Sequence, residues 1–352
     1  MNEYERKERL RRRLPELLEL EELSVTSRLY GDVTIEDQVC CGELKLPIYS
    51  FGFGAKDSHY PRIAFVGGVH GLERIGTNVA IAFLKAILGL MQWDAATRHL
   101  LARCRLLFLP LVNPGGMYAR SRANPHGVDL MRNAPLEAET RPNVLLVGGQ
   151  RLSSVLPWYR GRPGAAMERE ARVLATFVRR ELFSAPFSLA LDLHSGFGMV
   201  DRLWFPFAYT RRPFDHIDAM SALRTRLTAS LPHHVYVMEP QAQQYVTHGD
   251  LWDWLFLEHR QEQPTRRMLP LTLEMGSWLW VKKNPWQAFS SLGVFNPILP
   301  HRLQRTLRRH TALLDFLLRA TAAYEAWADP DRMVAEGHKE RALALWYGAK
   351  NN

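Results

Sequence analysis

Short apolar runs typical of buried strands alternate along this chain with patterns typical of amphipathic helices. Strand-like runs cover residues 62–66, 105–109, 187–193 and 269–274, and a helical stripe of apolar residues covers 75–90. Strands that alternate with helices form a sheet covered by helices on both faces. The sequence therefore predicts an α/β fold with a mixed, mostly parallel central sheet.

No internal repeat or shift in composition divides the chain, so we expect one catalytic domain over residues 24–296. The highly charged residues 1–23 are predicted to form an N-terminal helical extension. Residues 297–352 are predicted to form a C-terminal helical extension, built on a long amphipathic helix over 301–327. Residues 135–163 are rich in Pro, Gly and Arg, which indicates a long loop.

The composition, 47% hydrophobic and 23% charged, is typical of a globular protein. No run reaches the roughly 18–20 uncharged apolar residues of a transmembrane helix, and the charged start lacks the apolar segment of a secretory signal. The three cysteines, of which Cys40 and Cys41 are adjacent, show no disulfide framework. These features predict a cytoplasmic protein without a membrane partner.

The net charge of +9 raises the question of a nucleic-acid partner. The basic residues are scattered, however, and the densest runs, 6–13 and 302–309, are typical of solvated helix faces. The chain has no zinc-finger spacing, RNA-binding aromatic motif or Gly-rich phosphate loop. We therefore expect no nucleic-acid partner.

Two histidines and a glutamate follow strand-like runs and could share a metal ion. His70 and Glu73 come just after the run 62–66, and His194 directly follows the run 187–193. Alone, His70 could cap the next helix, and Glu73 could be a first-turn carboxylate favoured by the helix dipole. Ligands collect beyond the carboxyl ends of strands in open α/β sheets. Two imidazoles and one carboxylate leave a fourth zinc position open, as in catalytic sites.

A set of motifs in fixed order resembles zinc carboxypeptidases of the carboxypeptidase A type. The short bacterial members, such as murein peptide amidases, look most similar, and the resemblance covers about residues 40–290. The motifs are His70-Gly71-Leu72-Glu73, Asn113-Pro114-Gly115-Gly116, Gly127-Val128-Asp129-Leu130-Met131-Arg132-Asn133, Asp192-Leu193-His194-Ser195, Tyr245-Val246-Thr247-His248-Gly249-Asp250-Leu251-Trp252-Asp253-Trp254 and Thr272-Leu273-Glu274. The resemblance implies a zinc carboxypeptidase-like fold.

The resemblance also implies the metal centre and its base. His70, Glu73 and His194 match the ligands of Zn²⁺, and Glu274 matches the general base. Glu274 ends an apolar run, where burial would raise its pKa. A carboxylate there can take a proton from zinc-bound water, whose pKa is about 7, and pass it to the leaving amine. Asp129 matches the carboxylate that orients the first histidine.

Arginines between the metal motifs match residues that act on the substrate. Arg122 matches the residue that stabilises the oxyanion, with Arg120 as the alternative two positions away. Arg132 matches the residue that grips a terminal carboxylate through its planar fork. Met131 stands where the family usually has Asn, so a substrate with another end group stays possible.

Two aromatic residues complete the predicted substrate site. Tyr245 matches the family's mobile tyrosine, which closes over the substrate. Trp252 falls where the family sets side-chain preference, and it either narrows that pocket or packs in the core. Both residues are therefore candidates for binding the substrate.

The resemblance predicts a zinc-dependent hydrolase that cleaves an amide bond by promoted-water attack. A metallocarboxypeptidase or peptide amidase acting on a small peptide is the first expectation. An N-acyl amino acid deacylase of the aspartoacylase or succinylglutamate desuccinylase type, acting on an acyl-amino acid, is the first alternative. A catalytically silent binding protein of the same fold is the second. The sequence determines neither the natural substrate nor the oligomeric state.

Overall fold

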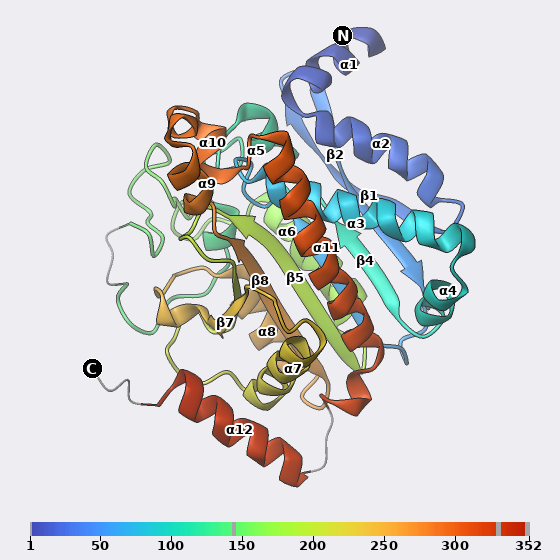
Figure 1. The fold of residues 1–352 in the computed structure, drawn as a ribbon. Coiled ribbons are helices and arrows are strands. Elements are labelled where there is room, and N and C mark those ends of the chain that lie inside the picture. The colour runs from blue at the N-terminus through green and yellow to red at the C-terminus, as the bar shows by residue number, and fades with distance from the viewer. Residues whose placement is uncertain (1, 143–145, 329–331, 349–352) are drawn as a thin grey trace.

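A mixed sheet of eight strands runs through the computed structural model, which describes residues 2–142, 146–328 and 332–348 (Figure 1). The strand order is β1-β2-β4-β3-β5-β8-β6-β7. The strands are β1 (Gly31–Cys41), β2 (Leu44–Gly54), β3 (Arg62–Gly67), β4 (Arg105–Leu109), β5 (Phe187–Ser195), β6 (Arg202–Phe205), β7 (Val237–Pro240) and β8 (Arg267–Met275).

The centre of the sheet is parallel and its flanks contain the antiparallel pairs. β3 pairs in parallel with β4 and β5, β5 with β8, and β6 with β7. β1–β2, β2–β4 and β6–β8 are antiparallel. Every residue of β3 and β5 is buried, which explains why these strands appear in the sequence as continuous apolar runs. The predicted mixed, mostly parallel sheet is confirmed.

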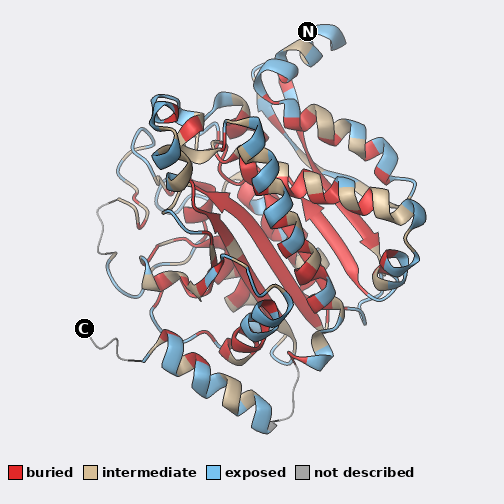
Figure 2. Cartoon of the chain, in the orientation of Figure 1, coloured by how far each residue is buried: buried red, intermediate tan, exposed pale blue. Residues whose placement is uncertain are grey.

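Helices cover both faces of the sheet and bury two apolar clusters (Figures 1 and 2). One face carries α2, α3, α7 and α11, and the other carries α6 and α8. The helices are α1 (Glu3–Arg13), α2 (Pro15–Ser27), α3 (Arg74–Trp93), α4 (Ala95–Leu101), α5 (Pro114–Ala119), α6 (Arg169–Leu182), α7 (Ile217–Ser230), α8 (Leu251–Glu262), α9 (Trp278–Lys283), α10 (Ser291–Phe295), α11 (Pro300–Ala322) and α12 (Arg332–Trp346). Short 3-10 turns cover Leu130–Arg132, Gln241–Gln243, Pro285–Phe289 and Tyr324–Ala326.

Helix α3 is long and apolar enough to cross a membrane by length and composition alone. In the structure it packs against β3, β5 and α11, with Val79, Phe83 and Ile87 buried. It therefore forms part of the core, and its apolar stripe is the one that the sequence predicted over 75–90.

The terminal segments pack on the same core as the sheet. The N-terminal segment forms two helices, because Pro15 begins a second helix directly after Leu14. Four of its leucines, Leu10, Leu14, Leu17 and Leu20, are fully buried in the larger cluster. The domain boundaries at residues 24 and 296 stay predictions.

The structure also refines the expected loop and C-terminal helix. Residues 135–163 contain no helix or strand where they are described, apart from a bridge between Gln150 and Tyr159; 143–145 lie outside the described residues. The long helix predicted over 301–327 ends at Ala322. Helix α12 follows later in the chain. It is hydrogen-bonded to the sheet, because Trp346 Nε1 donates to the carbonyl of Met238 in β7 at 2.9 Å.

Candidate active site

The carboxyl ends of three neighbouring parallel strands meet at one edge of the sheet. β3, β5 and β8 end there, and the register places His194 opposite Glu274 on the adjacent strand. His70 and Glu73 lie in the connection between β3 and α3. All four residues line one cavity of about 440 Å³, as expected for ligand sites in open α/β sheets.

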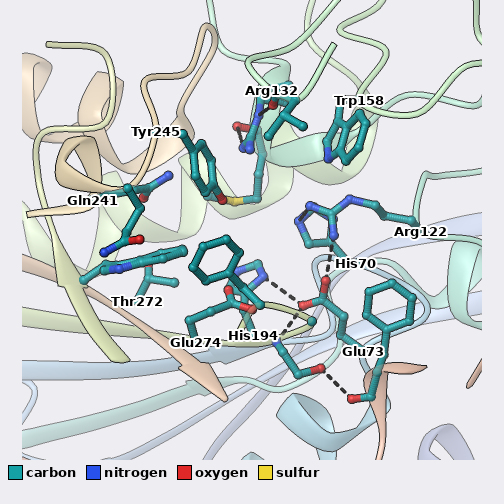
Figure 3. A pocket seen from close by; sticks show the side chains of 18 of the residues that line it. His70, Glu73, Arg122, Arg132, Trp158, His194, Gln241, Tyr245, Thr272 and Glu274 are labelled. Atoms are coloured by element: carbon teal, nitrogen blue, oxygen red, sulfur yellow. Dashed lines mark hydrogen bonds and ion pairs between the residues drawn. The ribbon is translucent and has the colours of Figure 1, made fainter. Parts of the chain in front are cut away.

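The three predicted metal ligands converge at the base of this cavity (Figure 3). His70, Glu73 and His194 are buried, and one potential ligand atom of each lies within 4.8 Å of the others. Glu73 Oε2 lies 3.2 Å from His194 Nδ1 and accepts a hydrogen bond from the Ser195 backbone N–H at 2.9 Å. The carboxylate is thus held in place by His194 and the backbone of the next residue.

The chemistry of this cluster fits a divalent zinc ion. His70 Nδ1 is buried without a hydrogen-bond partner among the described residues. Burial and the nearby Arg122 hold the pKa of His70 well below its usual value, so the ring is in the neutral form that binds metals. Burial opposes the charge of Glu73, but His70, His194 and Arg122 outweigh it and lower the pKa of Glu73. Two imidazoles and one ionised carboxylate are the donors of an open zinc site.

The Asn113 turn holds the loop that carries His70 and Glu73. Asn113 Oδ1 accepts from the Gly116 N–H at 2.8 Å, while its Nδ2 donates to the Val69 carbonyl at 3.2 Å. Gly71 lies so close to this turn that a Cβ there would sit 2.2 Å from the Gly116 carbonyl carbon. Only glycine fits at position 71, because the two backbones touch.

A buried carboxylate and a buried indole stand behind His194. Asp192 Oδ2 lies 2.8 Å from His194 Nε2, and Trp252 Nε1 donates to the same oxygen at 2.8 Å. Burial lowers the pKa of His194, but Asp192 and Glu73 outweigh it and raise that pKa well above its usual value. The sequence left two roles open for Trp252, and the structure contradicts its assignment as a substrate-binding residue: the indole does not line the substrate cavity but packs behind a metal ligand. The reason is that α8 turns the indole toward the sheet, where a buried acceptor binds it.

Arg122 joins the metal ligands to Asp129. Its Nη1 donates to Glu73 Oε1 at 2.8 Å, its Nη2 to His70 Nε2 at 2.7 Å, and its Nε to Asp129 Oδ2 at 3.0 Å. Burial works against its charge, but Asp129 and Glu73 outweigh it and raise the pKa of Arg122. Arg120, the alternative, is exposed in a left-handed conformation at the end of α5 and does not line the cavity.

Asp129 lies beside His70 but binds other groups. Its Oδ1 is 3.8 Å from His70 Nδ1, beyond hydrogen-bond distance. That oxygen accepts from the Met131 N–H at 3.1 Å, and Oδ2 accepts from Arg122. Asp129 therefore holds Arg122 by a direct hydrogen bond, and it lies near His70 without a hydrogen bond to it.

Glu274 is a buried acid at the end of β8, 8% exposed. Burial, and then repulsion from Glu73, raises its pKa to about 8. A carboxyl group poised near neutral pH can both accept and return a proton.

The far side of the cavity carries the predicted substrate residues. Arg132 is buried, with long hydrogen bonds of 3.4 Å to the carbonyls of Val147 and Met131. Tyr245 lines the same cavity, and burial raises its pKa. Met131 faces the cavity, while Asn133 points away and donates to the Arg160 carbonyl at 3.0 Å.

Sequence reasoning missed several residues of the site. Asp192 and Thr272 lie two positions before His194 and Glu274 in their strands, so strand alternation could have placed each pair on one face. Several other cavity residues come from loops and short helices and carried no such signal; they include Trp158, Phe197, Gln241, Trp278 and Phe295.

Comparisons with known proteins agree with this geometry. Residues 8–277 match the zinc carboxypeptidase family. Bovine thrombin-activatable fibrinolysis inhibitor, solved with a tick carboxypeptidase inhibitor, has a TM-score of 0.60 at 16% identity, covering 87% of this chain and 95% of its own. Carboxypeptidase A from Helicoverpa armigera has a TM-score of 0.60 at 18% identity, covering 86% of this chain and 71% of its own.

A metallo-carboxypeptidase from Burkholderia cenocepacia has a TM-score of 0.50 at 14% identity, covering 84% of this chain and 67% of its own. A search of curated proteins found no match to this chain. At these identities the solved structures show the fold, while the family match covers most of the sequence and contains all the motifs up to Glu274. The chain therefore belongs to the zinc carboxypeptidase family and is a metallopeptidase of that type.

Proposed function

We propose that this protein removes the C-terminal residue of a small peptide by promoted-water hydrolysis. One observation carries the proposal: buried Glu274 lies opposite His194 in the register and shares a cavity with the metal ligands and two arginines. An acid, a metal site and cationic side chains in one cavity are the groups that metal-assisted amide hydrolysis uses.

Zn²⁺ held by His70, Glu73 and His194 would supply a Lewis acid, which makes water more acidic and polarises a carbonyl group. Glu274 accepts one proton from the attacking water while the oxygen forms a bond to the carbonyl carbon. As the C–N bond breaks, Glu274 returns that proton to the leaving nitrogen, so its charge is restored.

The two arginines in the cavity have different roles, one in stabilising the oxyanion and one in binding the substrate carboxylate. Arg122, fixed by three hydrogen-bonded partners, presents positive charge where the carbonyl oxygen becomes an oxyanion. Arg132, whose bonds to carbonyls are long, can turn its fork to a substrate carboxylate. Tyr245 lies next to it and can donate its hydroxyl proton, which its raised pKa retains.

Met131 is the observation that favours a second candidate. Its thioether cannot donate the hydrogen bond that an Asn amide would give to a terminal carboxylate. An N-acyl amino acid deacylase would use the same metal ligands and Glu274. The position of Tyr245 in the cavity supports the peptidase.

A substrate panel with metal removal tests the proposal. We expect peptides with a free carboxyl terminus to be cleaved, and their amidated forms to be cleaved at least about tenfold more slowly, because one charge-assisted contact to Arg132 is lost. Dialysis against a chelator should abolish turnover and added Zn²⁺ should restore it. Preferred cleavage of acyl-amino acids would identify the deacylase, and zinc-loaded protein that hydrolyses no amide would identify a silent binding protein; either result contradicts the proposal.

Replacing Trp252 by Phe is expected to weaken zinc binding by about 10–100-fold, because Asp192 loses the donor that orients it toward His194. Competition with a chromophoric chelator measures the affinity. Trp254→Phe, in the same helix and stacked on Arg179, is the matched control and should bind zinc as the parent does. Equal affinities in both variants would show that the indole only packs.

A further inference from the structure

We propose that a surface beside the active-site mouth docks on an anionic lipid bilayer. This docking surface consists of Lys282 and Lys283 at the end of α9, and Trp286 and Phe289 in the 3-10 turn that follows. It goes beyond the proposed peptidase activity, and none of these four residues lines the catalytic cavity.

The segment that carries the docking surface is entirely free of acidic residues. No Asp or Glu occurs between Glu274 and Asp315. Lys282 and Lys283 are exposed, and neither forms an ion pair with another described residue. Arg302, at the start of α11, donates to the Trp280 and Lys283 carbonyls and so adds its charge nearby. Such a cluster attracts an anionic surface and repels a cationic one.

Two large aromatic side chains project from the same place. Trp286 is 80% exposed and Phe289 is 86% exposed, and their ring centroids lie 5.8 Å apart. Single exposed apolar residues are common, but an adjoining pair flanked by lysines is characteristic of an interface. Aromatic rings settle at the headgroup level of a bilayer while neighbouring lysines contact anionic lipids. An anionic bilayer satisfies both features at once, because its headgroups attract the lysines and its interfacial region takes up the rings.

The segment that carries the docking surface is hydrogen-bonded to the catalytic centre on both sides of that surface. Trp278 Nε1 donates to the Gly196 carbonyl at 2.9 Å, and Ser195 Oγ donates to the Phe295 carbonyl at 2.8 Å. Asn296 binds the loop of the first two metal ligands, donating to the Leu72 carbonyl at 2.8 Å. Trp278 and Phe295 line the cavity themselves.

Helices α9 and α10 lie together beside the start of α11, and the 3-10 turn that connects them is largely exposed (Figures 1 and 2). A bilayer bound there would hold the cavity mouth close to its surface, within reach of amides presented at the membrane. The expectation of no membrane partner followed from the lack of a long uncharged apolar run, and a surface of this kind needs no such run.

Flotation with lipid vesicles tests the proposal on the full chain. We expect binding to vesicles of equal parts phosphatidylglycerol and phosphatidylcholine, and little binding to phosphatidylcholine alone. The Lys282→Gln/Lys283→Gln variant should bind the anionic vesicles at least about tenfold more weakly, and high salt should weaken the parent in the same way. Trp286→Ser/Phe289→Ser should show a loss of similar size, because the apolar contact disappears.

The control is Trp93→Ser, which removes a 72% exposed tryptophan at the distant end of α3 and should leave binding unchanged. Failure of the parent to float with anionic vesicles, equal flotation with neutral ones, or docking-surface variants that bind like the control would each overturn the proposal. Peptidase assays on a soluble peptide separate the two proposals, since the docking-surface variants should retain chelator-sensitive turnover. Vesicle binding by a protein without peptidase activity would contradict only the proposed function.

Discussion

Replacing Glu274 by Gln is expected to lower kcat by between about 10²- and 10⁴-fold, the usual contribution of a general acid–base residue. The amide has nearly the same shape as the carboxylate, but it cannot accept the proton of the attacking water. Because Glu274 is buried beside Glu73, its ionised form is unfavourable in the fold. The substitution removes that repulsion, so it should lower the rate of the chemical step without lowering the stability of the fold.

Thermal unfolding, measured on the parent and the variant at the same zinc content, distinguishes a loss of catalysis from a loss of folding stability. The folded pKa of Glu274, about 8 without a metal, lies above the ordinary value of 4.5. For an acid with a raised pKa, stability is present at low pH and falls as pH rises through this window. The Gln variant of the metal-free protein should therefore match the parent near pH 5 and exceed it near pH 8.

The pH profile gives an independent readout of the same residue. Activity of the parent should rise as Glu274 loses its proton, and a bound cation shifts this rise below the metal-free value. The residual activity of Glu274→Gln should lack this acid limb. Glu262→Gln, at the exposed end of α8, is the control and should behave as the parent. A zinc-loaded Glu274→Gln enzyme with the parent's kcat would remove Glu274 from the mechanism.

The features that the sequence predicted correctly, the central strands and the metal ligands at their ends, depend on local sequence patterns. Continuous apolar runs identified β3, β5 and β8, because central parallel strands are buried on both faces. Polar residues at the ends of these strands then had to meet at one edge, which brought His70 and His194 together. Strand order and register were not needed for this step, since every parallel strand ends at the same side of the sheet.

What the sequence could not predict depends on contacts between distant segments. Position 252 lies in the expected tyrosine segment, yet its side chain turns away from the cavity because Asp192, 60 residues earlier, accepts its indole N–H. Helix α8 itself is not evident from the sequence, since its Trp and Phe residues support either a strand or a helix. Likewise, the N-terminal helices have the charge of a solvated extension, but their leucines fill the core beside β2 and α3.

Replacing Arg122 by Lys is expected to lower kcat by about 10²–10³-fold, the cost of losing one fixed oxyanion donor. Lysine keeps the charge, but its single ammonium group cannot satisfy Glu73, His70 and Asp129 together, as the guanidinium does. The charge that faces the substrate carbonyl is then no longer held in place.

The matched control is Arg120→Lys, two residues away, where the side chain is exposed and outside the cavity. Its kcat should equal that of the parent, and zinc content should be measured in both variants because Arg122 contacts two ligands. If zinc-loaded Arg122→Lys retains full kcat while Arg120→Lys loses it, the oxyanion role belongs to Arg120. The loop of α5 must then rearrange on substrate binding, because only Arg122 of these two reaches the metal ligands in the structure.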